Sequence, residues 1–322
     1  MLATDMPRRP LGNTGFMVSP IAFGALTIGP VHKNMSVSEG AAVIRAGLEE
    51  GINLIDTAQC YETYPYIREA IKGWQDHVYI TTKSYAWNRL LMAEAFEEAR
   101  QELDRDKLDI FLLHEQESGL TIQGHYEALE FLLAEKAKGN LGAVGISTHA
   151  VAAVIAAADM PEIDVIHPII NIYGHGIIDG TRDDMLRAIS YAASKGKGLY
   201  GMKALAGGKL SEEAQQCFRW AFGIKELSSF AVGMKSLAEV YINTAWVKGM
   251  EAPKEYVEAY VAENRHITVG ENCSGCGSCV KRCGQRAISL LPQTNKAYIE
   301  EKKCVLCGYC RDNCRESAIN IF

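Results

Sequence analysis

Eight of the ten cysteines in this 322-residue chain occur near the C-terminus in two copies of one spacing, Cys-x2-Cys-x2-Cys-x3-Cys. The two copies comprise Cys273, Cys276, Cys279 and Cys283, then Cys304, Cys307, Cys310 and Cys314. A short loop with this spacing presents its thiolates to a 4Fe-4S cluster. The repeat therefore predicts a small domain built around two clusters, in a chain that carries electrons.

Zinc and disulfides are the alternative uses of these thiols. Structural zinc sites usually separate two cysteine pairs by a longer loop or include histidine, whereas here four thiols fall within eleven residues, twice. Disulfides are disfavoured because the N-terminal residues lack a basic and apolar secretory signal. No apolar run approaches the length of a membrane span. We expect a cytoplasmic protein without a membrane partner, from a cell that lives with little oxygen.

Residues 267–322 resemble the two-cluster ferredoxins of bacteria, down to an internal repeat at Ala287-Ile288 and Ala318-Ile319. The resemblance implies that the fourth cysteine of each run binds the other cluster. The two ligand sets would be Cys273, Cys276, Cys279 and Cys314, and Cys304, Cys307, Cys310 and Cys283. The proline that usually follows the fourth cysteine is replaced by Gly284 and Arg315, which affects the expected geometry of the loop.

Charge separates this tail from the rest of the chain. From Ile267 onward there are eight Lys or Arg and five Asp or Glu, so the tail carries +3 and the remainder −9 of the total −6. An oxidised cluster with four thiolates carries about −2, and the basic excess partly offsets that charge. The excess is too small to indicate a nucleic-acid partner, and we expect none.

Before this tail, apolar segments of strand length alternate with amphipathic segments of helix length. The expected strands are 20–26, 53–58, 78–84, 108–114, 143–148, 165–173, 199–205 and 230–235. The expected helices include 38–50, 92–103, 126–138, 183–195 and 212–222. Eight alternations predict a (β/α)8 TIM barrel. An open doubly wound sheet is the alternative, but no Gly-x-Gly-x-x-Gly motif follows the first expected strand.

We therefore expect an α/β chain of three parts. Residues 1–250 would form the barrel, and residues 267–322 a small α+β ferredoxin-like domain. Residues 251–266 would connect them, with a helix over 253–263.

Polar side chains stand where three successive expected strands end. Asp56, Lys83 and His114 end the second, third and fourth strands, and Tyr61 follows Asp56 by five residues. The carboxyl ends of barrel strands meet at the end where active sites lie. When a carbonyl accepts hydride its oxygen needs a proton, which Tyr61 can supply if the Lys83 ammonium lowers the tyrosine pKa. Asp56 would keep Lys83 charged, and His114 would hydrogen-bond the substrate oxygen.

These four residues match the complete catalytic tetrad of the aldo-keto reductase superfamily, which the chain resembles from residue 7 to about residue 250. The stretch Arg9–Gly15, followed by Val18-Ser19-Pro20 and Phe23-Gly24, is similar to that family's opening hairpin and first strand. The resemblance implies a barrel that reduces small-molecule carbonyls with NADPH or NADH.

The resemblance also suggests where the nicotinamide would bind. Ser147 is retained from the family's Ser-Asn pair, Thr148 and His149 stand where the Asn falls, His167 lies near an expected Gln, and Met202 near an expected stacking Tyr. Histidine or threonine can hydrogen-bond a carboxamide, and methionine can cover a flat ring. The candidate cofactor residues are Ser147, His149, His167, Asn171, Met202, Lys203, Lys235, Ser236 and Asn243.

The segment Gly201–Leu210 resembles a subgroup of the superfamily that carries C-terminal iron-sulfur motifs. In that subgroup Lys203 would face the cofactor, and Gly207 and Gly208 would approach a pyrophosphate. The residues with which the family binds the adenosine phosphate and adenine are similar to Lys235, Ser236 and Asn243 here. A lysine opposite a 2'-phosphate favours NADPH.

Three functions are compatible with these patterns. The first is a carbonyl reductase with Tyr61 as the acid, which takes electrons from NAD(P)H, through the clusters, or from both. The second keeps the barrel and tetrad but replaces nicotinamide by a flavin or by a ferredoxin or other redox protein, since clusters pass single electrons. The third is an electron-relay subunit with an inactive barrel, which the intact tetrad disfavours. The substrate is not identified by the sequence.

Overall fold

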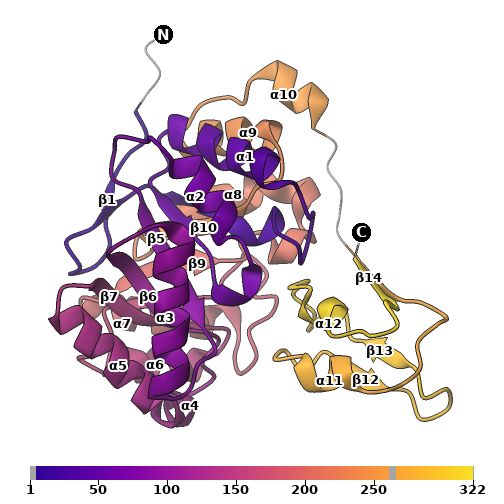
Figure 1. The fold of residues 1–322 in the computed structure, drawn as a ribbon. Coiled ribbons are helices and arrows are strands. Elements are labelled where there is room, and N and C mark those ends of the chain that lie inside the picture. The colour runs from indigo at the N-terminus through magenta and orange to yellow at the C-terminus, as the bar shows by residue number, and fades with distance from the viewer. Residues whose placement is uncertain (1–4, 261–265, 322) are drawn as a thin grey trace.

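The computed structural model describes residues 5–260 and 266–321, and its larger part is a closed barrel of eight parallel strands (Figure 1). The strands follow chain order around the barrel, and the last pairs with the first. They are β3 (Ile21–Gly24), β4 (Leu54–Asp56), β5 (Tyr79–Ser84), β6 (Leu108–Leu113), β7 (Leu141–Thr148), β8 (Val165–Pro168), β9 (Gly198–Met202) and β10 (Ser229–Gly233). The predicted (β/α)8 barrel is confirmed, and the open sheet was the wrong alternative.

Helices cover the outside of the barrel, so its strands are buried on both faces (Figure 1). They are α1 (Val37–Glu49), α2 (Tyr64–Ile71), α3 (Arg89–Leu103), α4 (Gly119–Gly124), α5 (Tyr126–Ala137), α6 (Val151–Ala158), α7 (Arg182–Ser194), α8 (Ala214–Phe222) and α9 (Leu237–Val247). Ser36, Ser118 and Thr181 begin three of them with capping boxes, in which the hydroxyl accepts a hydrogen bond from the backbone three residues on.

A short hairpin closes the amino-terminal end of the barrel. Its strands β1 (Arg9–Pro10) and β2 (Met17–Val18) pair antiparallel, as the resemblance implied. Leu11 and Val18 of the hairpin pack against the interior side chains Leu54 and Ile110. This apolar plug fills one end of the barrel and leaves the carboxyl ends of the strands for polar groups.

Two expected strands end three or more residues earlier in the structure than the sequence predicted. The segment 165–173 is a strand only over β8, because Asn171 forms a turn in which its side chain pairs with the backbone of His175 in both directions, at 2.9 Å each. The segment 199–205 is a strand only over β9, because Lys203 takes a left-handed backbone conformation with a φ of 61°. Apolar composition alone did not reveal these turns.

The C-terminal unit, residues 266–321, repeats one pattern twice: a strand, a cysteine loop, a short helix and a strand. Its elements are β11 (Ile267–Val269), α11 (Ser278–Arg282), β12 (Ile288–Leu290), β13 (Ala297–Ile299), α12 (Tyr309–Asp312) and β14 (Ile319–Ile321). The first strand pairs with the last and the middle two pair with each other, all antiparallel. Both repeated Ala-Ile pairs are buried. The isoleucine of each pair is the first residue of a strand, where Ile288 pairs with Ile299 and Ile319 with Val269.

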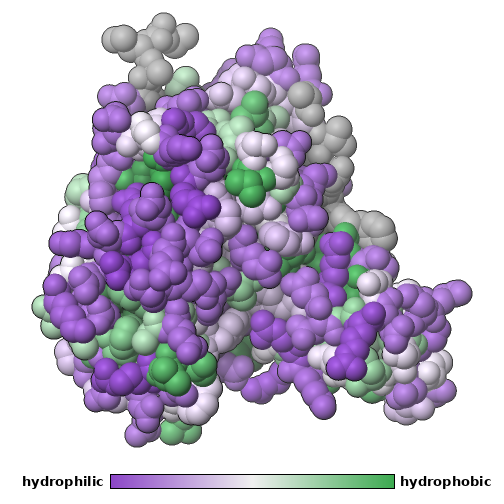
Figure 2. All heavy atoms as spheres, in the orientation of Figure 1, coloured by the Kyte–Doolittle hydropathy of each residue, from purple (hydrophilic) through white to green (hydrophobic). Residues whose placement is uncertain are grey.

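The segment between barrel and C-terminal unit contains α10 (Lys254–Ala259), which is shorter than the helix predicted over 253–263. Residues 261–263 of that prediction lie outside the described residues. In the described part of the chain, no helix is both long and apolar enough to cross a membrane. Figure 2 shows one face of the molecule, which is mostly hydrophilic, with hydrophobic residues in small groups.

Candidate active site

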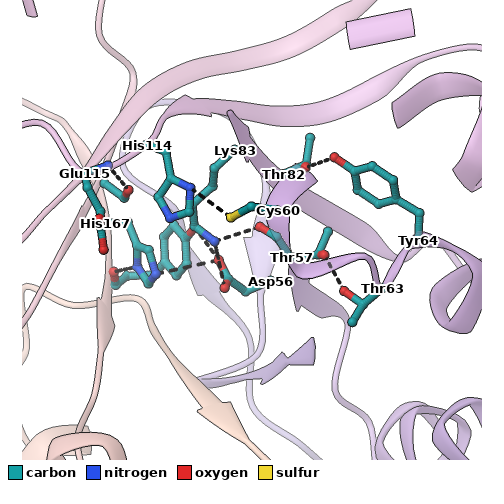
Figure 3. Close-up of polar contacts among 12 residues, drawn as sticks. Asp56, Thr57, Cys60, Thr63, Tyr64, Thr82, Lys83, His114, Glu115 and His167 are labelled. Atoms are coloured by element: carbon teal, nitrogen blue, oxygen red, sulfur yellow. Dashed lines mark hydrogen bonds and ion pairs between the residues drawn. The ribbon is translucent and has the colours of Figure 1, made fainter. Parts of the chain in front are cut away.

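The carboxyl ends of β4, β5 and β6 bring Asp56, Lys83 and His114 together (Figure 3), and Tyr61 lies beside them. Asp56 is the last residue of β4, Lys83 lies in β5, and His114 follows β6. Tyr61 closes a 3-10 turn, Gln59–Tyr61, just after β4. All four are at least nine-tenths buried, with Lys83 only 1% exposed. A lysine so buried requires a partner, which the neighbouring strand provides.

Asp56 and Lys83 form a buried ion pair. The Lys83 Nζ lies 2.9 Å from Asp56 Oδ1 and 2.8 Å from Oδ2, and it also donates to the Thr57 carbonyl at 2.7 Å. Burial without such partners would cost several kcal/mol. The predicted role of Asp56, to hold Lys83 charged and oriented, is therefore consistent with the geometry.

Tyr200 and His167 complete the surroundings of Asp56, and the sequence had not indicated Tyr200. The Tyr200 hydroxyl donates to Asp56 Oδ2 at 2.9 Å, and His167 Nε2 lies 3.6 Å from the same oxygen. The His167 ring stacks on Tyr200 with centroids 3.8 Å apart, and its Nδ1 lies 2.7 Å from the Tyr200 carbonyl. Tyr200 lies in β9, and its contact with Asp56 of β4 joins two distant strands of the barrel.

Tyr61 is held in its neutral form by its environment. Burial raises the pKa of Tyr61 well above its usual value, the Asp56 charge raises it further, and a hydrogen bond from Tyr309 opposes them. The expected influence of Lys83 is weaker than the sequence suggested, because the ammonium faces the Tyr61 ring at 5.0 Å from its centroid and donates to Asp56 and Thr57 instead. A protonated tyrosine is the form that a proton donor requires.

His114 is also neutral. Burial, followed by the charge of Lys83, lowers its pKa well below the usual value. The ring stacks on Tyr85 with centroids 4.3 Å apart, and its Nδ1 lies 3.9 Å from the Cys60 sulfur. A neutral imidazole can donate one hydrogen bond to a substrate oxygen.

A cavity of about 400 Å³ opens beside Asp56 and Tyr61 and extends along the ends of β9 and β10 toward α9. This volume is within the range of small-molecule sites. Five of the proposed cofactor residues line it: His167, Met202, Lys203, Lys235 and Asn243. Trp246 lines its far part, and Val305 and Leu306 of the C-terminal unit form part of its wall.

The other four proposed cofactor residues do not line this cavity. The Ser147 hydroxyl accepts a hydrogen bond from the Glu115 backbone at 2.9 Å, and Ser236 caps α9. Asn171 is used by the turn after β8, and His149 contacts the side chain of Gln285 in the C-terminal unit. These four residues make hydrogen bonds around the site and do not contact the space inside the cavity.

The C-terminal unit covers the mouth of the barrel above the tetrad. Tyr309 packs in one apolar cluster with Tyr61, Ala58 and Val31. The Arg282 guanidinium lies between the rings of Tyr85 and Tyr309, at 5.2 and 5.0 Å from their centroids.

Polar contacts fix this position of the unit. Lys209 donates to the Cys304 carbonyl at 2.7 Å, and His32 lies 3.2 Å from the Cys307 carbonyl. Arg286 pairs with Glu117 at 2.8 Å. Gly207, which the sequence assigned to a phosphate loop, packs so closely that a Cβ would meet the Val305 carbonyl. The wall of the cavity therefore depends on the C-terminal unit.

Four cysteines from both runs line a second, small cavity of about 20 Å³ inside the C-terminal unit: Cys283, Cys304, Cys307 and Cys310. Burial, then the charges of its neighbours Cys307, Cys304 and Cys283, raises the pKa of Cys310. Val305 and Leu306 line this cavity as well as the larger one. Among the described residues, no three His, Cys, Asp or Glu side chains converge so as to hold a single metal ion.

A family model described as "Aldo/keto reductase family" matches residues 20–262. L-galactose dehydrogenase of Arabidopsis thaliana is 24% identical over 77% of this chain and 90% of its own length. Methylglyoxal reductase YeaE of Escherichia coli is 32% identical, over 38% of this chain and 41% of its own length.

Solved structures share the fold at low identity. An aldo-keto reductase from Bacillus halodurans in its holo form has a TM-score of 0.61 and 20% identity, over 80% of this chain and 97% of its own. An aldo-keto reductase from Bombyx mori in complex with NADP has a TM-score of 0.60 and 14% identity, over 80% and 92%.

The buried histidines make stability depend on pH. Burial lowers the pKa of both His149 and His167 to about 3, whereas an unfolded histidine titrates near 6.5. Between these values only the unfolded state binds the proton, so acid destabilises the fold. From pH 7.5 to 5.5 we expect each histidine to remove about 1.4 kcal/mol from the free energy of unfolding. Urea denaturation at both pH values measures this free energy. Between pH 7.5 and 5.5 the His167→Gln variant should lose about 1.4 kcal/mol less than the wild type. An equal loss in variant and wild type would contradict the lowered pKa of His167.

Proposed function

Because the chain belongs to the aldo/keto reductase family and is an oxidoreductase, we propose that it reduces the carbonyl group of a small molecule with Tyr61 as the proton donor. The observation that carries this proposal is the buried Asp56–Lys83 pair beside Tyr61, at the wall of a cavity of about 400 Å³. The matched relatives are named methylglyoxal reductase and L-galactose dehydrogenase, so small aldehydes and sugars are the first substrates to test.

The chemistry assigned to this chain is the delivery of one proton and the orientation of one oxygen. A nicotinamide cofactor, when bound, supplies the hydride to the carbonyl carbon. Tyr61 then gives its proton to the oxygen, and neutral His114 donates a hydrogen bond to the same oxygen. The cationic end of Lys83, 5.0 Å from the Tyr61 ring centroid, favours the negative charge that Tyr61 acquires.

The larger cavity supports nicotinamide binding along its length. Met202 and His167 lie near Asp56 at one end, where a ring would bind, and Lys235 and Asn243 lie toward α9. Lys203 and Lys235 place positive charge in a cavity that would receive phosphates. A lysine near the adenosine end favours NADPH over NADH.

We also propose two 4Fe-4S clusters in the C-terminal unit. In such a cluster each cysteine binds a different iron, so the thiolates surround a volume and do not converge on one point. Cys283, Cys304, Cys307 and Cys310 line one small cavity, and Cys283 comes from the other run, as the ferredoxin resemblance implies. Backbone N–H groups also donate to the Cys283 and Cys314 sulfurs, at 3.3 and 3.2 Å. We assign Cys273, Cys276, Cys279 and Cys314 to the other cluster.

One observation favours a second candidate, a reductase that receives electrons through the clusters from a ferredoxin or another redox protein. Val305 and Leu306 separate the cysteine cavity from the barrel cavity by a single layer of side chains. A cofactor in the barrel, nicotinamide or flavin, would then lie next to the cluster held by the second run. The domain boundaries and the cytoplasmic location stay predictions from the sequence.

Replacement of Tyr61 by Phe removes the proposed proton donor and leaves the ring. General acids typically contribute about 10²- to 10⁴-fold, so we expect carbonyl turnover to fall at least about 10²-fold. Turnover is measured as NADPH oxidation with methylglyoxal or an aldose. Tyr126→Phe, at a surface tyrosine on α5, is the matched control and should keep full activity. Full activity in Tyr61→Phe would sink the catalytic assignment.

Iron content tests the clusters directly. The anaerobically purified protein should contain about eight iron atoms per chain, and Cys307→Ser or Cys276→Ser should lose iron and visible absorbance. The control is Cys217→Ser, because Cys217 is a buried cysteine of α8 outside both runs, and it should keep both signals. Zinc in place of iron, or unchanged iron in all three variants, would rule out this proposal.

A further inference from the structure

Tyr309 reaches the catalytic residues from outside the barrel. It is the first residue of α12, directly before the third cysteine of the second run, and it is 6% exposed. Its hydroxyl lies 3.9 Å from the sulfur of Cys60, the residue that precedes Tyr61 in the chain. Its ring contacts the ring of His114 edge-on, with centroids 6.5 Å apart. A phenol of the C-terminal unit thus packs in one buried cluster with Tyr61 and meets the ring of His114.

Tyr61 needs a hydrogen-bond donor that the lysine does not supply here. Lys83 donates to the Asp56 carboxylate and the Thr57 carbonyl. After Tyr61 gives up its proton, its oxygen carries a negative charge on a side chain that is only 8% exposed. A donor aimed at that oxygen stabilises the charge, and hydrogen bonds to charged groups are the stronger ones. A hydrogen bond from Tyr309 is among the causes that lower the Tyr61 pKa, against the larger effect of burial.

We propose that Tyr309 is a positioning residue of the active site, whose hydroxyl donates to the Tyr61 oxygen and supports it during proton transfer. In this step the Tyr61 O–H bond breaks and its proton passes to the substrate oxygen. Tyr309 keeps its own proton and gains a stronger hydrogen bond, so it exchanges no electrons. The inference rests on the proposed function, because it assigns Tyr309 a role only if Tyr61 is the acid.

Two consequences follow for the molecule. The reductase site is incomplete without the C-terminal unit, because one of its hydroxyls comes from that unit. The loop that holds Tyr309 also holds Cys307 and Cys310, so whatever orders the cysteine loop also orders the support of Tyr61. A rival explanation is that Tyr309 only fills the space where substrate binds.

The test is Tyr309→Phe in the full-length, iron-loaded protein, with Tyr298→Phe as the control, since Tyr298 is an exposed tyrosine of the same unit. We expect kcat to fall about 10- to 100-fold with little change in KM. The alkaline limit of the kcat pH profile should move to higher pH, because the loss of a donor raises the Tyr61 pKa. Tyr298→Phe should match the wild type in both measurements.

Two further variants separate the possible outcomes. In Tyr61→Phe, the additional change Tyr309→Phe should cost nothing more, because the two hydroxyls act together. Tyr309→His keeps an N–H donor and should therefore retain a higher kcat than Tyr309→Phe. This difference is expected even if the Phe variant loses iron. Equal kcat in the His and Phe variants, or a Phe variant with lower KM and unchanged or higher kcat, would overturn the inference. If Tyr61→Phe itself keeps full activity, the proposed function has failed first.

Discussion

The buried ion pair between Asp56 and Lys83 is the interaction on which the candidate site depends. Two unlike charges, almost inaccessible to water, are tolerable only when both are fully paired, and the barrel provides the pairing through neighbouring strands. Tyr200 and the Thr57 carbonyl supply the remaining hydrogen bonds. The positive end of this pair faces the Tyr61 ring, so the arrangement that satisfies Lys83 also prepares the place where a proton leaves.

The C-terminal unit lies over this arrangement and is in contact with it. Its second cysteine loop lines the barrel cavity through Val305 and Leu306, accepts hydrogen bonds from Lys209, and packs Tyr309 against Tyr61. In Figure 1 the unit is the orange-to-yellow part of the chain that contains α11 and α12, to the right of the barrel. A segment that could have been an independent electron carrier is therefore part of the wall of the reductase site.

Much of this was predictable from the sequence. Strand and helix periodicity gave the barrel, because continuous apolar segments and amphipathic segments alternate without interruption. The tetrad could be proposed because each member stands at or just after the end of an expected strand, and the topology brings those ends together.

What could not be predicted rests on contacts between distant parts of the chain. The partner of Tyr200 is 144 residues away, and Tyr309 meets Cys60 across 249 residues. The contact of His149 with Gln285 likewise required the placement of the C-terminal unit. The early ends of β8 and β9 depend on side-chain turns and on a left-handed residue, which hydrophobicity does not report.

The central claim is that the barrel cavity binds a nicotinamide nucleotide, and Trp246 on the cavity wall can report it. The most direct measurement is an anaerobic titration with NADPH and then NADH, followed by tryptophan fluorescence and by calorimetry. We expect saturable quenching that is mostly lost in Trp246→Phe, while the calorimetric binding persists in that variant. Absence of saturable calorimetric binding of both nucleotides to the wild-type protein would contradict nicotinamide binding in this cavity.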